Sequence, residues 1–234
     1  MRIKFLSIVA FLLSFFYSNA TMVKEKYVVI NPEGTKIYDQ PKFDSKVVAY
    51  LNFGDLVLKS ESIVSKDLLL VANNIRLPGN WIVVNKENTK AYIFSAHLSN
   101  RENILYVDDH GAKTYNLKGE LLGSSTNTIS KPTTSGGTFK TTTKDEEFEN
   151  ALRKEIFTDC LFVTINYKSA DLNELYFEVI HKFVPLSQDG QLELPVRNFQ
   201  KYNEVIFESM GALEDLKITI SGEEGSVISY YTCD

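Results

Sequence analysis

The sequence predicts a mostly β protein in which a small barrel precedes an antiparallel β-sandwich-like domain with one short helix. Three features of the 234 residues lead to this fold class. Aromatic and β-branched residues recur in short runs, turn-forming residues separate these runs at close spacing, and only one segment has the composition of a helix. A Ser/Thr-rich stretch divides the chain into two parts.

Residues 1–20 are predicted to be an export signal. Arg2 and Lys4 give the segment a positive start, an apolar run extends from Phe5 to Phe16, and Ser18-Asn19-Ala20 supplies a small-residue exit. The apolar run is shorter than the roughly 20 residues that a membrane-spanning helix needs. We therefore expect a cleaved signal peptide and a protein that is periplasmic or extracellular, without stable membrane insertion. The competing interpretation is an uncleaved membrane anchor.

Residues 21–100 contain short apolar runs bounded by turn-forming groups such as Asn31-Pro32-Glu33-Gly34 and Pro78-Gly79-Asn80. Close spacing without any helical pattern between the runs predicts a small barrel. The strands that we expect are Tyr27–Ile30, Thr35–Tyr38, Lys46–Leu51, Leu56–Ser60, Leu68–Ala72, Trp81–Asn85 and Lys90–Phe94.

Several motifs follow one another in this region in a fixed order. They are Thr35–Pro41, Asp44–Leu51, Phe53-Gly54-Asp55, Gly79-Asn80-Trp81 and Ala91-Tyr92-Ile93-Phe94-Ser95-Ala96-His97-Leu98. In this order they resemble the bacterial SH3 (SH3b) domain family. The chain departs from that family at Tyr38-Asp39-Gln40-Pro41, which lacks the usual Arg and Gly, and at Ala91, where Gly is usual. The resemblance implies an SH3-like barrel that attaches to the cell wall or to a protein.

Five aromatic residues of this region are the candidate binding residues: Tyr38, Tyr50, Phe53, Trp81 and Tyr92. In SH3-like barrels, aromatic side chains on one side form a groove that can hold an extended peptide or a glycan strand. Trp81 and Tyr92 also occupy positions that would help to fill a small core. Burial is therefore the competing expectation for these two residues.

Residues 101–123 are expected to add a hairpin, in which Asp108-Asp109-His110-Gly111 joins Ile104–Val107 to Lys113–Leu117. Residues 124–144 differ in composition, because 12 of the 21 are Ser or Thr. So few apolar side chains cannot offset the entropy lost on ordering the chain. We therefore expect a flexible linker there.

Residues 145–234 are expected to form the β-sandwich-like domain, in which no family resemblance is identified. Asp145–Phe157 is predicted to be its helix, with Asp145 as the N-cap. The last two strands alternate apolar and polar residues and are expected to form a hairpin through Gly222-Glu223-Glu224-Gly225. The predicted strands are Cys160–Tyr167, Glu174–Val184, Gln191–Leu194, Glu204–Ser209, Leu216–Ser221 and Val227–Thr232.

Cys160 and Cys233 are the only cysteines of a chain that we expect to be exported, so a disulfide between them is the main prediction. The alternative is that Cys160 is a nucleophile. Cell-wall cysteine peptidases of the NlpC/P60 type, which often follow SH3b domains, carry Asp-Cys-Ser-Gly, whereas this chain has Asp159-Cys160-Leu161-Phe162. The only downstream histidine, His181, has no recognisable orienting partner. We therefore expect no catalysis.

The formal net charge is −5, and it becomes −7 once Arg2 and Lys4 are removed with the signal. Without a cluster of Lys and Arg, this balance argues against nucleic acid as a partner. Asp108-Asp109-His110 is too short a group to predict a metal site, and no cofactor is expected. The sequence thus predicts a non-catalytic binding protein of the bacterial envelope, whose partner is peptidoglycan or an envelope protein. Two alternatives remain, an inhibitor or immunity-type protein that occludes a hydrolase, and a divergent cell-wall hydrolase that uses Cys160.

Overall fold

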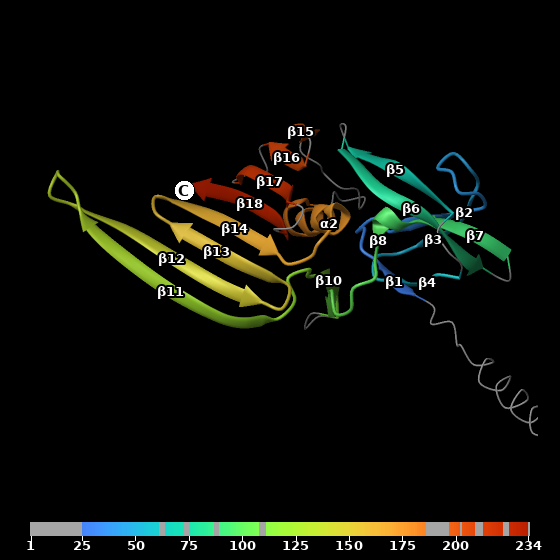
Figure 1. Cartoon of the computed structure of the whole chain (residues 1–234), viewed down its shortest axis with the longest axis horizontal. Coiled ribbons are helices and arrows are strands. Elements are labelled where there is room, and N and C mark those ends of the chain that lie inside the picture. The colour runs from blue at the N-terminus through green and yellow to red at the C-terminus, as the bar shows by residue number, and fades with distance from the viewer. Residues whose placement is uncertain are drawn as a thin grey trace, which may run out of the picture.

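The computed structural model describes residues 25–60, 64–72, 75–86, 89–107, 111–185, 197–201, 203–208, 213–221 and 225–233. Most of these residues lie in antiparallel strands, and a single α-helix, α2 (Leu172–Phe183), accompanies them. The predicted mostly β class with one helix is therefore confirmed (Figure 1). The export signal, the Asp108-Asp109-His110 turn and the predicted strand Gln191–Leu194 lie outside the described residues.

The N-terminal strands form two antiparallel sheets. The five-stranded sheet has the order β3-β2-β7-β6-β5, the three-stranded sheet has the order β4-β1-β8, and a bridge between Lys59 and Val84 joins them. The expected strands are present, but in the described part of the chain they do not close into one barrel. Their bounds are β1 Lys26–Val29, β2 Thr35–Tyr38, β3 Val47–Leu51, β4 Leu56–Leu58, β5 Ser65–Ala72, β6 Ile75–Lys86, β7 Thr89–Phe94 and, after the 3-10 turn Ser95–His97, β8 Leu98–Ser99.

Pro78-Gly79-Asn80 was expected to be a turn, and instead it lies within β6, where Pro78 pairs with Leu68 of β5. Gly79 is needed for close packing. A Cβ atom at this position would lie 2.6 Å from the ring of Phe94 and 3.0 Å from the backbone nitrogen of Ala96. The missing side chain therefore lets the rest of the sheet approach β6.

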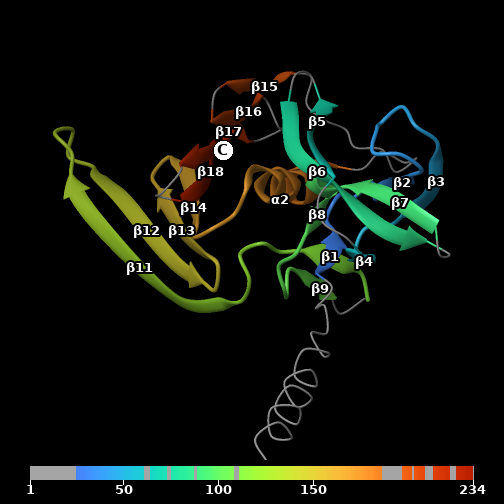
Figure 2. The same cartoon turned by 45° about the vertical axis from the view of Figure 1, so that its right-hand side comes forward.

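The C-terminal strands form one eight-stranded antiparallel sheet in the order β11-β12-β13-β14-β18-β17-β16-β15. A small hairpin of β9 and β10, which matches the predicted hairpin extension, precedes it. Helix α2 lies between this sheet and the N-terminal strands (Figure 2). The bounds are β9 Leu105–Val107, β10 Lys113–Tyr115, β11 Leu121–Pro132, β12 Thr138–Phe148, β13 Ala151–Phe157, β14 Cys160–Tyr167, β15 Arg197–Lys201, β16 Glu204–Glu208, β17 Glu214–Ser221 and β18 Gly225–Cys233.

The flexible linker expected at 124–144 is instead the long hairpin of β11 and β12. Threonine favours extended backbone because of its branched Cβ. Facing threonines also bond across the ladder, as Thr128 and Thr142 do at 3.1 Å. At the tip, Thr133 accepts from the backbone of Gly136 and Gly137, and Gly136 takes a φ of 83°. Backbone pairing thus orders a segment that has little to bury.

Asp145–Phe157 was predicted to be a helix, and this prediction is wrong. The segment is divided between β12 and β13. Its charged residues, which suit a helix by composition, pair along and across the strands. Glu146 is only 8% exposed and contacts Lys144 of its own strand at 2.6 Å and Arg153 of β13 at 2.9 Å. Strand pairing, supported by these ion pairs, therefore overrides the local helix preference.

Glu174–Val184 was predicted to be a strand, and it lies instead in α2 and its C-cap. Asp171 caps the helix and accepts from the backbone of Glu174, whose carboxylate in turn accepts from the backbone of Asp171. The spacing Asp-x-x-Glu is a capping box, so the start of this helix is encoded locally. The aromatic and β-branched residues that suggested a strand fill the space around the helix.

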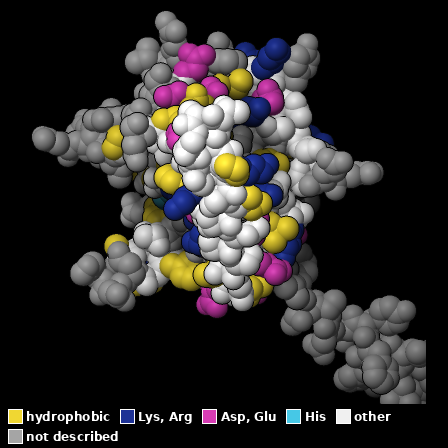
Figure 3. Space-filling view, turned by 90° about the vertical axis from the view of Figure 1, so that its left-hand side faces the viewer, with side chains coloured by type: hydrophobic (Ala, Val, Ile, Leu, Met, Phe, Trp, Pro, Cys, Tyr) yellow, Lys and Arg dark blue, Asp and Glu magenta, His cyan; other side chains and the backbone are white. Residues whose placement is uncertain are grey.

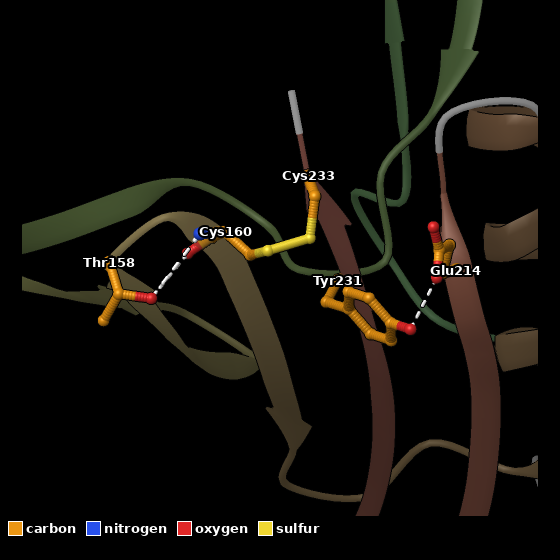
Figure 4. The surroundings of a disulfide bond; sticks show 5 residues. All are labelled: Thr158, Cys160, Glu214, Tyr231 and Cys233. Carbon is orange, nitrogen blue, oxygen red and sulfur yellow. Dashed lines mark hydrogen bonds between the residues drawn. A yellow bond between two sulfur atoms is a disulfide. The ribbon is translucent and has the colours of Figure 1, made fainter.

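The predicted disulfide between Cys160 and Cys233 is present and joins β14 to β18, where the two residues face each other in register (Figure 4). It closes a sequence separation of 73 residues. Beside it, Tyr231 donates a hydrogen bond of 2.5 Å to Glu214 of β17. The disulfide therefore links the last strand, β18, to β14 in the middle of the sheet.

One apolar cluster extends from the N-terminal strands into the C-terminal sheet. It includes Trp81 and Phe94 from the five-stranded sheet, Leu175 and Val179 from α2, and Ile218 from β17. Polar contacts cross the same boundary, because Glu174 accepts from Ser99 at 2.7 Å and from Arg101 at 2.8 Å. Helix α2 is thus a shared element of both parts.

Candidate functional site

A cavity of about 430 Å³ lies between the five-stranded sheet and α2, and we call it the aromatic pocket. Three strands, a loop and a helix contribute its rings, so residues far apart in sequence meet here. The aromatic residues that line it are Tyr38, Phe43, Tyr50, Phe94, Tyr176 and Phe177. The polar residues around them are Asn31, Glu33, Thr35, Lys36 and His97.

The aromatic pocket has a buried floor and an exposed rim. Tyr38, Phe94, Tyr176 and Phe177 are almost fully buried and form the floor. The rim is accessible, because Tyr50 on the edge strand β3 is 70% exposed. A ligand can therefore stack on the rim while a smaller group enters toward the floor.

Trp81 supports the pocket from within the core. Its side chain is fully buried, and its ring centroid lies 5.4 Å from that of Tyr38, 4.8 Å from that of Phe43 and 5.3 Å from that of Phe94. The indole nitrogen donates to Asp67 at 3.3 Å. Trp81 therefore orients three lining rings without lining the pocket itself.

The five sequence-predicted binding residues are only partly brought together. Tyr38 and Tyr50 line the aromatic pocket, and Trp81 lies behind it. Tyr92 is the strand neighbour of Tyr38 but does not line the cavity. Phe53 packs elsewhere, with its ring centroid 4.5 Å from that of His181 on α2.

Sequence reasoning missed Phe43, Phe94, His97, Tyr176 and Phe177 as lining residues. The signal that would have found the two α2 residues is the capping box, because it places Tyr176 and Phe177 on a helix rather than a strand. No local signal reveals that this helix returns to cover the N-terminal sheet.

The polar side chains around the pocket carry little net charge. Burial, with a smaller contribution from nearby Lys36, lowers the pKa of His97 to about 4, so the ring is neutral near pH 7. Its Nδ1 lies 2.9 Å from Oγ1 of Thr35. Burial and the nearby Glu33 carboxylate raise the pKa of Tyr176. The pocket therefore offers rings and neutral hydrogen-bonding groups, with Lys36 and Glu33 as the charged pair of opposite sign.

The alternative chemistry of Cys160 does not fit this geometry. Its sulfur is bonded to Cys233, so it is not the free thiolate that a cysteine nucleophile requires. In the described part of the chain, no group of three or more His, Cys, Asp or Glu is arranged to hold a metal ion. The same described residues include no helix long and apolar enough to span a membrane.

Comparison of the chain with protein-family models, curated proteins and solved structures gives no match.

Proposed function

We propose that the protein is an exported, non-catalytic binding protein of the bacterial envelope, and that the aromatic pocket holds a segment of cell-wall glycan. One observation carries this proposal. Six aromatic side chains line a single cavity whose rim residue, Tyr50, is 70% exposed. A large aromatic ring left in solvent beside a cavity is a common feature of ligand sites.

The chemistry of the pocket supports a sugar ligand. Sugar rings present flat faces of C–H groups that pack on aromatic rings, and hydroxyl groups that bond to tyrosine and amide groups. Neutral His97 and the near balance of Lys36 and Glu33 favour an uncharged ligand over a strongly ionic one. The SH3b-like motifs support the same ligand class, because the resemblance implies attachment to the wall.

A sedimentation assay with insoluble peptidoglycan tests the proposal. Tyr50→Ala should weaken retention of the protein about fivefold to tenfold, since one aromatic contact contributes about 1–1.5 kcal/mol. The matched control is Phe157→Ala, which removes an aromatic side chain that is 52% exposed on β13. Retention that is equal for all three proteins, or absent in the wild type, would refute glycan binding at this pocket.

A second candidate function is the occlusion of a hydrolase, and a different surface favours it. Residues 129–141, which we call the hairpin arm, extend beyond the last β12–β13 pair, Thr142 with Phe157 (Figure 1). The arm exposes Ile129 and Phe139. Exposed apolar side chains on a projecting hairpin suit a protein partner better than a glycan.

Gel filtration of the protein with a purified cell-wall hydrolase separates the two candidates. A one-to-one complex that Phe139→Asp abolishes and Tyr50→Ala leaves intact would favour the inhibitor. In the sedimentation assay, peptidoglycan retention that Tyr50→Ala weakens and Phe139→Asp leaves intact would favour glycan binding at the aromatic pocket.

A further inference from the structure

A second cavity, of about 470 Å³, lies between the β9–β10 hairpin and α2, and we call it the lysine pocket. Lys113 comes from β10, Lys118 from the segment after it, and Lys182 from the last turn of α2. Glu178 and His181 also line it. The lysine pocket and the aromatic pocket share no lining residue, so the two cavities are separate.

Lys118 and Lys182 have no ion-pair partner among the described residues. The Lys118 ammonium lies 4.3 Å from the ring centre of Phe148, and that of Lys182 lies 5.2 Å from the ring centre of Phe183. Lys113 donates to the backbone carbonyl of Gly54, at 3.3 Å. Three lysines therefore line one cavity, and none of them is bonded to a carboxylate of the residues that the structure describes.

The neighbouring sheet shows the opposite arrangement. On β12 and β13, Lys144 and Arg153 both contact the buried carboxylate of Glu146. These two cations thus have a bonded carboxylate, whereas Lys118 and Lys182 have none among the described residues.

Glu178 is the carboxylate of the lysine pocket, and it is directed to other partners. It accepts from the backbone N–H of Leu117 at 3.0 Å and from the hydroxyl of Tyr167 at 3.3 Å, and it is 4% exposed. Burial raises the pKa of this carboxyl. Its charge therefore compensates the lysines only from a distance.

The pKa values of two of these lysines indicate that too little negative charge lies near their ammonium groups. Burial, followed by repulsion from Lys118, lowers the pKa of Lys182 to about 8. Burial also lowers the pKa of Lys118. An anion placed between the two ammonium groups would stabilise their charged forms.

One wall of the pocket is aromatic and firmly held. The ring centroids of Tyr115 and His181 lie 5.2 Å apart, and Nε2 of His181 lies 2.7 Å from the carbonyl oxygen of Ile30. The hydroxyl of Tyr115 donates to the carbonyl of Glu174 at 3.2 Å. Such a wall suits a ligand that carries a flat or apolar body beside its charged group.

We propose that the lysine pocket binds a small molecule through a carboxylate or phosphate group, with Lys118 and Lys182 as its two charged contacts. Ammonium groups bind both kinds of oxyanion as point charges, so the two share one recognition chemistry. This site does not depend on the aromatic pocket. Anion binding at the lysine pocket can therefore be refuted while glycan binding at the aromatic pocket is supported, and glycan binding can be refuted while anion binding is supported.

Isothermal titration of the full chain at pH 7 and low salt tests the site, with inorganic phosphate in one arm and succinate in the other. Lys118→Gln and Lys182→Gln should each weaken binding at least about tenfold, because each removes a charge-assisted hydrogen bond to the ligand. The matched control is Lys154→Gln, which removes the same charge from an exposed residue of β13. Thermal unfolding of each variant verifies that it is folded.

Each outcome of the titration decides the proposal. Binding that both pocket variants weaken and the control leaves unchanged supports the site, and the arm that responds identifies phosphate or carboxylate as the ligand group. Absence of binding in both arms would overturn the proposal. So would an equal loss in Lys154→Gln, because attraction would then be a property of the whole surface.

Discussion

The N-terminal sheets and the eight-stranded C-terminal sheet bury their apolar residues in different ways. The N-terminal strands cover each other, with Val29, Ile37 and Ile82 enclosed between them. The C-terminal sheet has α2 over part of one face, and its β11–β12 end is exposed. Figure 3 looks onto the side of the molecule where this hairpin projects, and its surface is largely white, with separate hydrophobic and basic side chains. The comparison shows that burial holds the N-terminal strands and the middle of the C-terminal sheet, whereas backbone pairing alone holds the exposed β11–β12 end.

The largest expected effect tests whether the two parts unfold together. Trp81→Ala should reduce the free energy of unfolding by about 3–5 kcal/mol, because it empties the space at the centre of the shared cluster. Hydrogen exchange should speed up in β6 and also in α2, whose Leu175 and Val179 belong to the same cluster. Faster exchange confined to β6 and its neighbours would show that the two parts are independent.

The next effect concerns the C-terminal sheet. The double variant Cys160→Ser with Cys233→Ser should lower the free energy of unfolding by roughly 2–4 kcal/mol, since the bond closes a loop of 73 residues. Glycan retention through the aromatic pocket should survive under conditions in which the variant stays folded. The native protein should contain no free thiol, and titration of two reactive thiols would contradict the disulfide.

The same contrast explains what the sequence could predict. Most of the N-terminal strands were predictable because turn signals such as Asn31–Gly34 bound them locally, whereas Pro78-Gly79-Asn80 misplaced the start of β6. In the C-terminal part, the strands Cys160–Tyr167 and Glu204–Glu208 were recognised by their β-branched and aromatic runs. The hairpin at 124–144 was missed because backbone pairing within the hairpin and with β13, rather than burial, holds it.

The candidate site was predictable only where it depends on local sequence. Tyr38 and Tyr50 follow from the SH3b-like motifs, and both line the aromatic pocket. Tyr176 and Phe177 belong to a helix that packs against the N-terminal sheet across more than 80 residues of chain. Such a contact leaves no trace in a single sequence, since neither segment has a pattern that specifies the other.

A smaller, pH-dependent effect belongs to the N-terminal part. Folding lowers the pKa of His97 from its ordinary value of 6.5 to about 4, mainly through burial. Between these values the unfolded chain binds a proton that the folded chain does not, so stability falls as pH drops. At pH 4.5 the cost is about 2 kcal/mol relative to pH 7.5. His97→Gln should lose less unfolding free energy between these two pH values than the wild type, and an equal loss would show that His97 is not the group responsible.

The smallest expected effect is at the hairpin arm, which has no counterpart in the N-terminal sheets. Replacement of residues 129–141 by Asn-Gly joins Thr128 to Thr142, which already face each other, through a two-residue turn that favours hairpins. Residues 129–140 are exposed, so the free energy of unfolding should change by less than about 1 kcal/mol. In the intact protein, limited proteolysis should first cut the tip at 133–137, because the strands on either side are paired. Cleavage spread evenly over 124–144 would indicate a loose linker, and a large loss of stability on shortening would show that the arm packs against the body of the protein.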